Sequence, residues 1–313
     1  MFFYGQVILI NLLIKDIRSS KNHFRGCLRS GKVHNREGRA KNREEGKVTK
    51  TRKRYSSDLS PLQEELIKDY IPPAKPGGRP REVDMIEVLN AIFYVLVNGV
   101  PWRNLPGEFP PWSTVYHYFN QWRKEGVWEE IHEQLKTIVR VMEGRHPSPS
   151  AGILDSQSVK TGTWVNREVG YDGGKNIKGR KRFTLVDSFG LLIAVSVMAA
   201  SVPEREGAKL LLQKVKNKST PDARLIRIFV DGGFSGEDFM KMIMNTLGFI
   251  IEVVLRSQDA KGFVLLPKRW VVERTFGWFN HWRRLSKDYE VLPETTEAFI
   301  HVGMIRLMLR RLA

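Results

Sequence analysis

The spacing of apolar residues changes at about residue 150. In DMIEVLNAIFYVLVNG, residues 84–99, the apolar positions 85, 88, 89, 92, 93 and 96 recur with the period of a helix. After residue 152, apolar residues come in short β-rich runs such as LLIAVSVMAAS and RLIRIFVDGG, separated by the helical stretches EREGAKLLLQKVK and GEDFMKMIMNTLG. Helices followed by strands that alternate with helices predict an α+β/α/β chain, in which a helical domain precedes a domain with a mixed sheet.

Cap and turn signals set the expected boundaries. Ser60 before Pro61 is typical of a helix start, and Gly99 is typical of a helix end. The stretch EGRHPSPSAG, residues 143–152, has the composition of an interdomain linker. We therefore expect a basic, disordered extension over 1–53, a helical domain over 54–142 with four helices, a linker over 143–152 and an α/β domain over 153–313.

The net charge indicates a polyanionic partner such as nucleic acid. The chain of 313 residues carries a formal charge of +17, of which residues 15–54 carry +11 and residues 55–313 only +6. The segment 15–54 is either a basic arm that contacts phosphates or an extension upstream of the folded domain, and its lack of periodicity favours the extension.

The single cysteine, Cys27, excludes an internal disulfide framework, and no Cys/His spacing resembles a zinc site. The apolar opening MFFYGQVILINLLI is shorter than the roughly 20 residues that a membrane-spanning helix needs. It also lacks the marks of a signal peptide. We expect a cytoplasmic protein without a membrane role.

Residues 84–125 have the arrangement of a helix-turn-helix. In the functional interpretation, the helix over 113–125 contacts DNA bases or phosphates, with Tyr116, Asn120, Arg123 and Lys124 as the contacting residues. In the alternative interpretation this helix belongs to a small helical bundle, and Val115, Tyr116, Phe119 and Trp122 form its core. The pattern alone leaves both interpretations open.

Two apolar runs end at an aspartate that is followed by small residues. GILDSQSVKTG, residues 152–162, contains Asp155, and LIRIFVDGGFSG, residues 225–236, contains Asp231. Acids at two strand ends can face each other, although an aspartate in this position is also typical of a turn. Asp187, in TLVDSFG, is interpreted as a turn residue between adjacent strands.

A third acid lies in KRWVVERTFGWFNHWRRLSKDYE, residues 268–290, which has the period of a helix. Its apolar stripe contains Val272, Phe276, Phe279 and Trp282. Glu273 follows Arg269 by one turn, at the edge of this stripe. The two side chains form either a surface ion pair or part of a site at the edge of the sheet.

Three carboxylates around one pocket suit a hard divalent cation, since Mg²⁺ binds oxygen ligands and keeps positions for water and phosphate. Two such ions about 4 Å apart can activate a nucleophile and stabilise the leaving oxygen at phosphorus. We expect Mg²⁺, or alternatively Mn²⁺, to be held by Asp155, Asp231 and Glu273, whose carboxylates should lie within about 4–8 Å of one another. The expected contacts to DNA phosphates come from Arg269, from a mobile basic loop over 171–182, and from helix 268–290; these residues are Lys175, Lys178, Arg180, Lys181, Arg182, Arg274, Arg283, Arg284 and Lys287.

Several stretches in order resemble transposases of bacterial insertion sequences, specifically the insertion sequence 5 family. They include KRYSSDLSPLQEELIKDYIPPAKPGGRPRE, PPWSTVYHYFNQWRKEGVWEEIH, LDSQSVKTG, KGRKRFTLVD, REGAK and AKGFVLLPKRWVVERTFGWFNHWRRLSKDYE, and the resemblance runs from about Arg54 to Leu312. It implies a ribonuclease-H-like catalytic domain with an Asp–Asp–Glu triad at Asp155, Asp231 and Glu273, and it matches the family's arginine to Arg269. It also implies multimers that act on paired element ends.

The chain departs from the broader signature of related elements at two positions. Leu266 stands where that signature has tyrosine, and Asn280 stands where it has lysine, so the roles of both positions are unassigned. The resemblance predicts a metal-dependent DNA transposase of the bacterial cytoplasm, associated with the nucleoid, that cleaves the terminal inverted repeats and joins the 3′-hydroxyl to target DNA. The alternatives are a catalytically inactive, repurposed DNA-binding protein and a metal-dependent nuclease without strand transfer.

Overall fold

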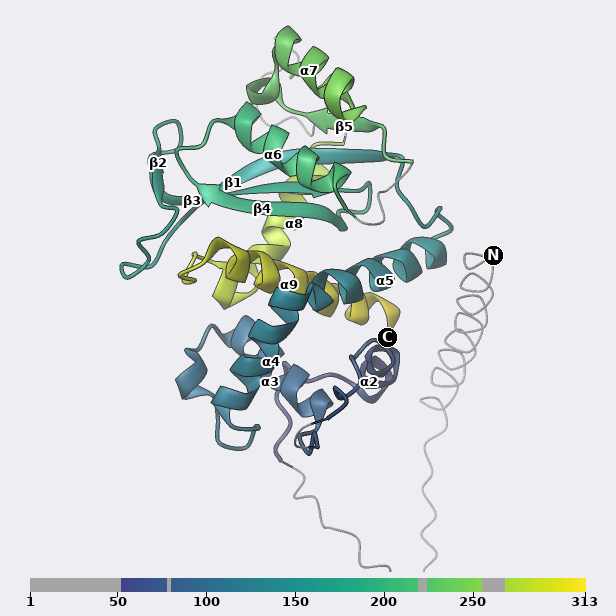
Figure 1. Ribbon diagram of the computed structural model, residues 1–313, viewed down its shortest axis with the longest axis vertical. Coiled ribbons are helices and arrows are strands. Elements are labelled where there is room, and N and C mark those ends of the chain that lie inside the picture. Colours follow the sequence, from purple (N-terminus) through teal and green to yellow (C-terminus); the bar gives the residue numbers. More distant parts are fainter. Residues whose placement is uncertain (1–51, 78–79, 219–223, 255–267) are drawn as a thin grey trace, which may run out of the picture. The chain divides into compact units, whose positions relative to one another are not determined.

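The computed structural model describes residues 52–77, 80–218, 224–254 and 268–313 (Figure 1). Contacts group Tyr55–Leu312 into one compact unit. The extension predicted over 1–53 lies almost entirely outside the described residues. Among the helices in the described ranges, none has both the length and the apolar composition needed to cross a bilayer.

Four helices form the N-terminal part of this unit, and two of their ends, at Ser60 and Gly99, follow the predicted caps. They are α2 (Pro61–Lys68), α3 (Met85–Asn98), α4 (Trp112–Glu125) and α5 (Val127–Met142). The Ser60 hydroxyl and the Gln63 amide form a capping box at the start of α2. Gly99 and Gly126 end α3 and α4 in the left-handed conformation, with φ of 70° and 74°.

The second part is built on a six-stranded mixed sheet. Its strands are β1 (Ala151–Lys160), β2 (Gly170–Asp172), β3 (Ile177–Val186), β4 (Leu192–Ala199), β5 (Arg227–Val230) and β6 (Ile250–Val253). The order is β2-β3-β1-β5-β6, with β4 also paired to β3. Strands β1, β3 and β4 are antiparallel neighbours, whereas β5 and β6 run parallel to β1, which confirms the predicted mixed sheet.

Helices cover both faces of this sheet (Figure 1). Helices α6 (Glu204–Lys216) and α7 (Glu237–Leu247) pack on one face, over a core that includes Leu154, Phe183 and Ile228. Helices α8 (Trp270–Asn280) and α9 (Pro293–Leu312) lie on the other side in Figure 1, where α8 contacts β1 and β3. A mixed sheet between helical layers is consistent with the predicted ribonuclease-H-like fold.

Helix α8 ends at Asn280, so the single helix predicted over 268–290 is wrong in its second half. Trp282 adopts an extended conformation, with φ of −99° and ψ of 116°. Its indole packs onto α9 where Gly303 has no side chain: a Cβ at Gly303 would lie 2.5 Å from the Trp282 ring. The tertiary contact with α9 therefore ends the helix.

Helix α9 is buried on nearly every side, because it packs against β4 and also against α2, α3, α4 and α5. Its Phe299 ring stacks on Phe119 of α4, with ring centroids 4.6 Å apart. The C-terminal helix thus shares a core with the N-terminal helices. The division into a helical domain, a linker over 143–152 and a second domain stays a prediction.

We expect the contact between α5 and α9 to weaken in mild acid. The rings of His132 and His301 lie 5.1 Å apart, and burial holds the pKa of His132 well below its usual value and lowers that of His301 to about 3. In the unfolded chain a histidine has a pKa of about 6.5, so below this pH the unfolded chain binds protons at both histidines whereas the folded chain does not. The free energy of unfolding therefore falls by up to about 1.4 kcal/mol per pH unit for each histidine.

The measurement is the urea midpoint between pH 7 and 5 for the protein and for a His132→Phe/His301→Leu variant. The variant should lose less stability than the parent over this range. A variant with the same pH slope as the parent would contradict the expectation, and His146→Gln, at an exposed histidine, is the control.

Candidate active site

The pairing of β1 with β5 brings the first two predicted acids together. The strands are parallel neighbours in a register that aligns Ile153 with Phe229. Asp155 lies two residues after Ile153, and Asp231 lies two residues after Phe229. The two aspartates therefore lie on the same face of the sheet, at the point where β1 and β5 separate. Asp155 is the fifth residue of a ten-residue strand and not a strand end as predicted, because β1 continues beside β3 to Lys160.

Local hydrogen bonds orient both carboxylates. Asp231 Oδ1 accepts a hydrogen bond of 2.9 Å from the backbone N–H of Gly233, in the 3₁₀ turn Gly232–Phe234. A Cβ at Gly233 would lie 3.1 Å from that oxygen, so a glycine keeps the approach open. Asp155 Oδ1 accepts from the backbone N–H of Ser156 at 2.7 Å. The two acids are therefore held by the backbone that follows each of them.

The environment of Asp155 disfavours its negative charge. Burial, the largest cause, and the negative charge of Asp231 together raise the pKa of Asp155 to about 6, although the hydrogen bond from the Ser156 N–H lowers it. The positive charges of Arg269 and Lys175 oppose this shift only in part. Nearby positive charge therefore compensates the pair of aspartates only in part, and a cation between them would lower the pKa of Asp155.

Arg269 connects the third acid to this pair. Its guanidinium nitrogen Nη2 lies 3.6 Å from Asp231 Oδ2 and 3.8 Å from Glu273 Oε1. The predicted pair between Arg269 and Glu273 is present, and the contact with Asp231 gives it a tertiary partner. The Glu273 side chain is 54% exposed, whereas that of Arg269 is 20% exposed. The buried stripe of α8, with Val272, Phe276 and Phe279, confirms that this helix presents Glu273 at the edge of the core.

The donor set has the chemistry that a hard divalent cation needs, since Asp155, Asp231 and Glu273 all offer carboxylate oxygens. Within the described ranges, however, no three acidic, histidine or cysteine side chains stand close enough to hold a metal ion together. Arg269 occupies the space between Asp231 and Glu273. A metal bound by all three carboxylates would thus require the Arg269 guanidinium to withdraw, and their separation of about 4–8 Å stays a prediction.

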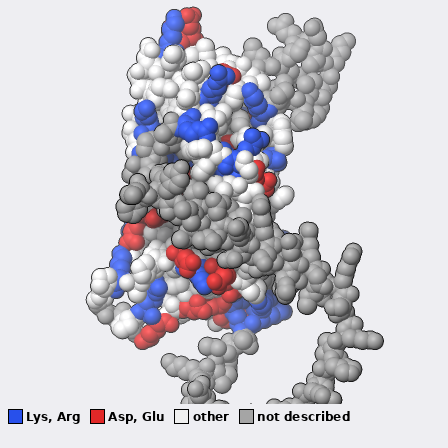
Figure 2. All heavy atoms as spheres, turned by 90° about the vertical axis from the view of Figure 1, so that its right-hand side faces the viewer, with Lys and Arg blue, Asp and Glu red and all other residues white. Residues whose placement is uncertain are grey.

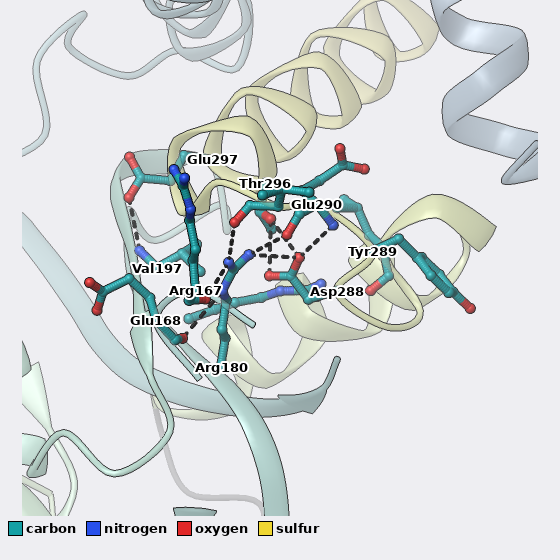
Figure 3. Close-up of polar contacts among 12 residues, drawn as sticks. Arg167, Glu168, Arg180, Val197, Asp288, Tyr289, Glu290, Thr296 and Glu297 are labelled. Carbon is teal, nitrogen blue, oxygen red and sulfur yellow. Dashed lines mark hydrogen bonds and ion pairs between the residues drawn. The ribbon is translucent and has the colours of Figure 1, made fainter. Parts of the chain in front are cut away.

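The basic loop predicted over 171–182 is a hairpin of β2 and β3. For three of its basic residues, the prediction of phosphate contacts is wrong. Arg180, Lys181 and Arg182 are buried in β3. Arg180 pairs with Asp288 at 3.1 Å and donates to the carbonyl oxygens of Arg167, Glu290 and Val291 (Figure 3). Arg182 donates to the carbonyl of Leu285 at 2.9 Å, and Lys181 pairs with Glu204 at 3.2 Å. These side chains hold the C-terminal segment and α6 against the sheet.

The other predicted DNA contacts are distributed differently. Lys175 and Lys178 are exposed, and the Lys175 ammonium donates to the carbonyl oxygen of Ser156, next to Asp155, at 3.2 Å. Lys124 and Lys287 are exposed, whereas Asn120 and Arg123 are partly exposed. Arg274 donates to the carbonyl of Phe189 at 2.8 Å and lies over the Trp270 and Trp278 rings, so it has a structural role in α8.

Three further positions were singled out in the sequence: Asp187, Asn280 and Leu266. Asp187 is a turn residue as predicted, since its Oδ1 accepts from the backbone N–H groups of Phe189 and Leu191, and its other oxygen pairs with Arg140. Asn280 is exposed at the end of α8, and Leu266 lies outside the described residues.

Glu204 is an acid near the site that the sequence analysis missed. The Glu204 side chain lies next to Gly233, two residues after Asp231: a Cβ atom placed on Gly233 would be 3.7 Å from Glu204 Cγ. The only sequence signal was its place in the acidic first turn of α6.

Two family models and two relatives match the chain. Residues 146–308 match the model described as "Transposase DDE domain", and residues 62–132 match "Putative transposase of IS4/5 family". The "Insertion element IS402 uncharacterized 16.2 kDa protein" of Burkholderia cepacia is 33% identical over 103 residues, which cover 30% of this chain and 67% of that protein. The "Putative transposase for insertion sequence element IS402" of the same organism is 26% identical over 129 residues, which cover 40% of this chain and 60% of that protein. With the first match spanning more than half of its length, the chain belongs to the family of DDE transposases of the IS4/5 group.

Proposed function

We propose that this transposase cleaves DNA strands at the ends of its insertion sequence and joins the freed 3′-hydroxyl to target DNA, with Asp155, Asp231 and Glu273 as its catalytic carboxylates. The observation that carries the proposal is that Asp155 and Asp231 each lie two residues beyond the paired residues Ile153 and Phe229, and that Arg269 contacts both Asp231 and Glu273. These acids come from three separate stretches of the chain.

The three carboxylates are the proposed ligands of Mg²⁺ or Mn²⁺. When bound, the metal would lower the pKa of a water molecule and stabilise negative charge on the oxygens at phosphorus. Asp155 must give up its proton to act as a ligand, and its pKa of about 6 places that loss just below neutral pH. The Gly233 N–H orients Asp231 through Oδ1, and Oδ2, which lies 3.6 Å from Arg269 Nη2, would bind the cation when the guanidinium withdraws.

Arg269 has two roles in this proposal. Without a metal ion it supplies positive charge to Asp231 and Glu273. With a divalent cation at the carboxylates, the Arg269 guanidinium would be free to contact a DNA phosphate next to the scissile bond, because its fork of donors suits phosphate oxygens. The in-line attack itself then depends mainly on positioning and charge neutralisation.

Basic side chains outside the triad are the proposed contacts to the DNA backbone. Lys175 and Lys178 lie at the turn between β2 and β3, and Lys287 follows α8. Figure 2, which views the molecule from the side away from the β2–β3 turn of Figure 1, shows further Lys and Arg side chains across its upper part, with some acidic side chains among them. The N-terminal helices are proposed to add a helix-turn-helix contact, through Asn120, Arg123 and Lys124, to terminal inverted repeats. Multimers that join two ends are part of the same proposal.

The test is an oligonucleotide assay with uncleaved and pre-cleaved insertion-sequence ends, in Mg²⁺ and in EDTA. We expect Mg²⁺-dependent cleavage of the first substrate and joined product from the second. Nicking without joining would replace the proposal with a metal-dependent nuclease. Binding without cleavage or joining would replace it with a repurposed DNA-binding protein.

A further inference from the structure

A groove with basic and aromatic walls lies between α4 and the segment before α9, apart from the carboxylate site. Its volume is about 940 Å³. One wall contains Trp112, Tyr116 and Arg123 of α4 with the preceding Arg103, and the other contains Arg167 and Tyr289. The volume is in the range of pockets that enclose small organic ligands, about 300–1,000 Å³, and is far too small for a turn of double helix.

The charge of the groove is positive and largely uncompensated. Glu290 is the single acid among its described lining residues, and it pairs with Arg284 at 2.7 Å. Four further cations line it: Arg103, Arg123, Lys124 and Arg167. Within the described ranges, none of these four forms an ion pair. The groove therefore suits a ligand with phosphate groups.

Two aromatic rings in the groove have exposed surface available for stacking. Trp112 is 39% exposed and Tyr116 is 41% exposed, whereas Phe119 and Trp122 of the same helix are buried in the core. The Trp102 ring meets Tyr116 edge to face at 5.4 Å and supports it from below. The Arg103 guanidinium lies 5.5 Å from the Trp112 ring centre. Exposed rings beside cations are the arrangement that stacks unpaired bases and contacts their phosphates.

The far wall of the groove is rigid, because it is tied to the catalytic sheet. Arg180 of β3 bonds the carbonyl oxygens of Arg167, Glu290 and Val291 (Figure 3). The indole N–H of the exposed Trp164 donates to the carbonyl of Tyr289, and the two rings stack at 6.1 Å. A rigid wall lowers the entropic cost of binding.

We propose that this groove binds unpaired nucleotides of the DNA substrate, with bases stacked on Trp112 and Tyr116 and phosphates held by Arg103 and Arg167. Arg123 and Lys124, on the α4 wall, are shared with the duplex contact proposed above. The proposal rests on the proposed function for the identity of the polyanion as DNA. Paired bases of a duplex are already stacked on one another and would meet only the cations. The aromatic rings thus select frayed or single-stranded DNA, as occurs at a strand end.

The test measures binding of the full chain to a fluorescent single-stranded oligonucleotide and to a hairpin duplex of the same composition. The Trp112→Ala/Tyr116→Ala variant should bind the single strand at least about tenfold more weakly, since stacking on aromatic side chains is lost, and the duplex as well as the parent does. The Trp112→Phe/Tyr116→Phe variant keeps both rings and should retain most of the affinity for the single strand. A 2-aminopurine base in the strand should be quenched by the parent and by the Phe variant, but not by the Ala variant.

Two results would overturn the proposal: an Ala variant that binds the single strand as tightly as the parent, or one that loses single-strand and duplex affinity equally. A circular-dichroism melt ensures that the Ala variant is folded. If the groove proposal fails, the parent should still cleave DNA and join strands. Failure of the proposed function would appear as no cleavage or joining by the parent, whatever the groove variants bind.

Discussion

Replacing Asp155 with asparagine is expected to abolish metal-dependent strand cleavage and, at the same time, to stabilise the metal-free protein at neutral pH. Cleavage is lost because asparagine cannot supply the negative oxygen that a hard cation binds. Stability rises because the folded chain resists the charge of Asp155, whose pKa is raised from 3.8 to about 6 by burial and by Asp231. The amide side chain that replaces the carboxylate would keep the hydrogen bond from Ser156 without that charge.

The pH dependence has a defined sign. Below pH 3.8, Asp155 is protonated in both the folded and the unfolded chain, and the stabilising contribution of its raised pKa is fully present. This contribution is lost as the pH rises through about 6, where Asp155 of the folded chain loses its proton. In EDTA at pH 8, Asp155→Asn should therefore be more stable than the parent by roughly 1–3 kcal/mol. At pH 4 the gain should be nearly absent. Urea midpoints at the two pH values give the comparison.

Two matched variants sharpen this result. Glu273→Gln should also lose cleavage, but with little change in stability, since its carboxylate is half exposed and its contact with Arg269 is a weak surface pair. Asp238→Asn, at an exposed acid of α7, should change neither property. An Asp155→Asn variant that cleaves at the parent rate would remove Asp155 from the triad. A variant less stable than the parent at pH 8 would contradict the charge argument.

Replacing Arg180 with methionine is expected to destabilise the protein severely, without acting through DNA. Arg180 is fully buried and pairs with Asp288, whose oxygens also accept from the hydroxyl of Thr296. Methionine would leave the Asp288 carboxylate and several carbonyl oxygens without their donor. Removing one partner of a buried ion pair typically costs about 3–5 kcal/mol. Urea unfolding and limited proteolysis measure the loss.

Lys178→Met is the control on the same strand. Lys178 is exposed, two residues before Arg180, so its replacement should leave stability unchanged and reduce DNA affinity. If Arg180→Met instead kept its stability and lost DNA affinity, the original interpretation of a phosphate-binding loop would be correct. If Arg180→Met does not fold, a second variant, Arg180→Met/Asp288→Asn, should recover part of the stability. Its second substitution removes the buried negative charge that is left without a partner when Arg180 is replaced.

Sequence patterns were sufficient for most of the secondary structure, because helix stripes and caps depend on neighbouring residues. The start of α2 at Ser60 and the end of α3 at Gly99 agree with expectation. The end of α8 at Asn280 could not be predicted, since it depends on the packing of Trp282 against Gly303 of α9.

For the candidate site, the sequence by itself determined the acids, the chemistry they could share and the family resemblance. Only the tertiary structure decided which cations stay exposed: the run KGRKR looks like a basic loop, yet Arg180 meets a partner 108 residues away and becomes part of the core. Tertiary structure also decided the raised pKa of Asp155, because that shift comes from burial and from Asp231 on another strand. Residue types and local spacing are written in the chain, whereas burial and charge partners arise only when distant segments meet.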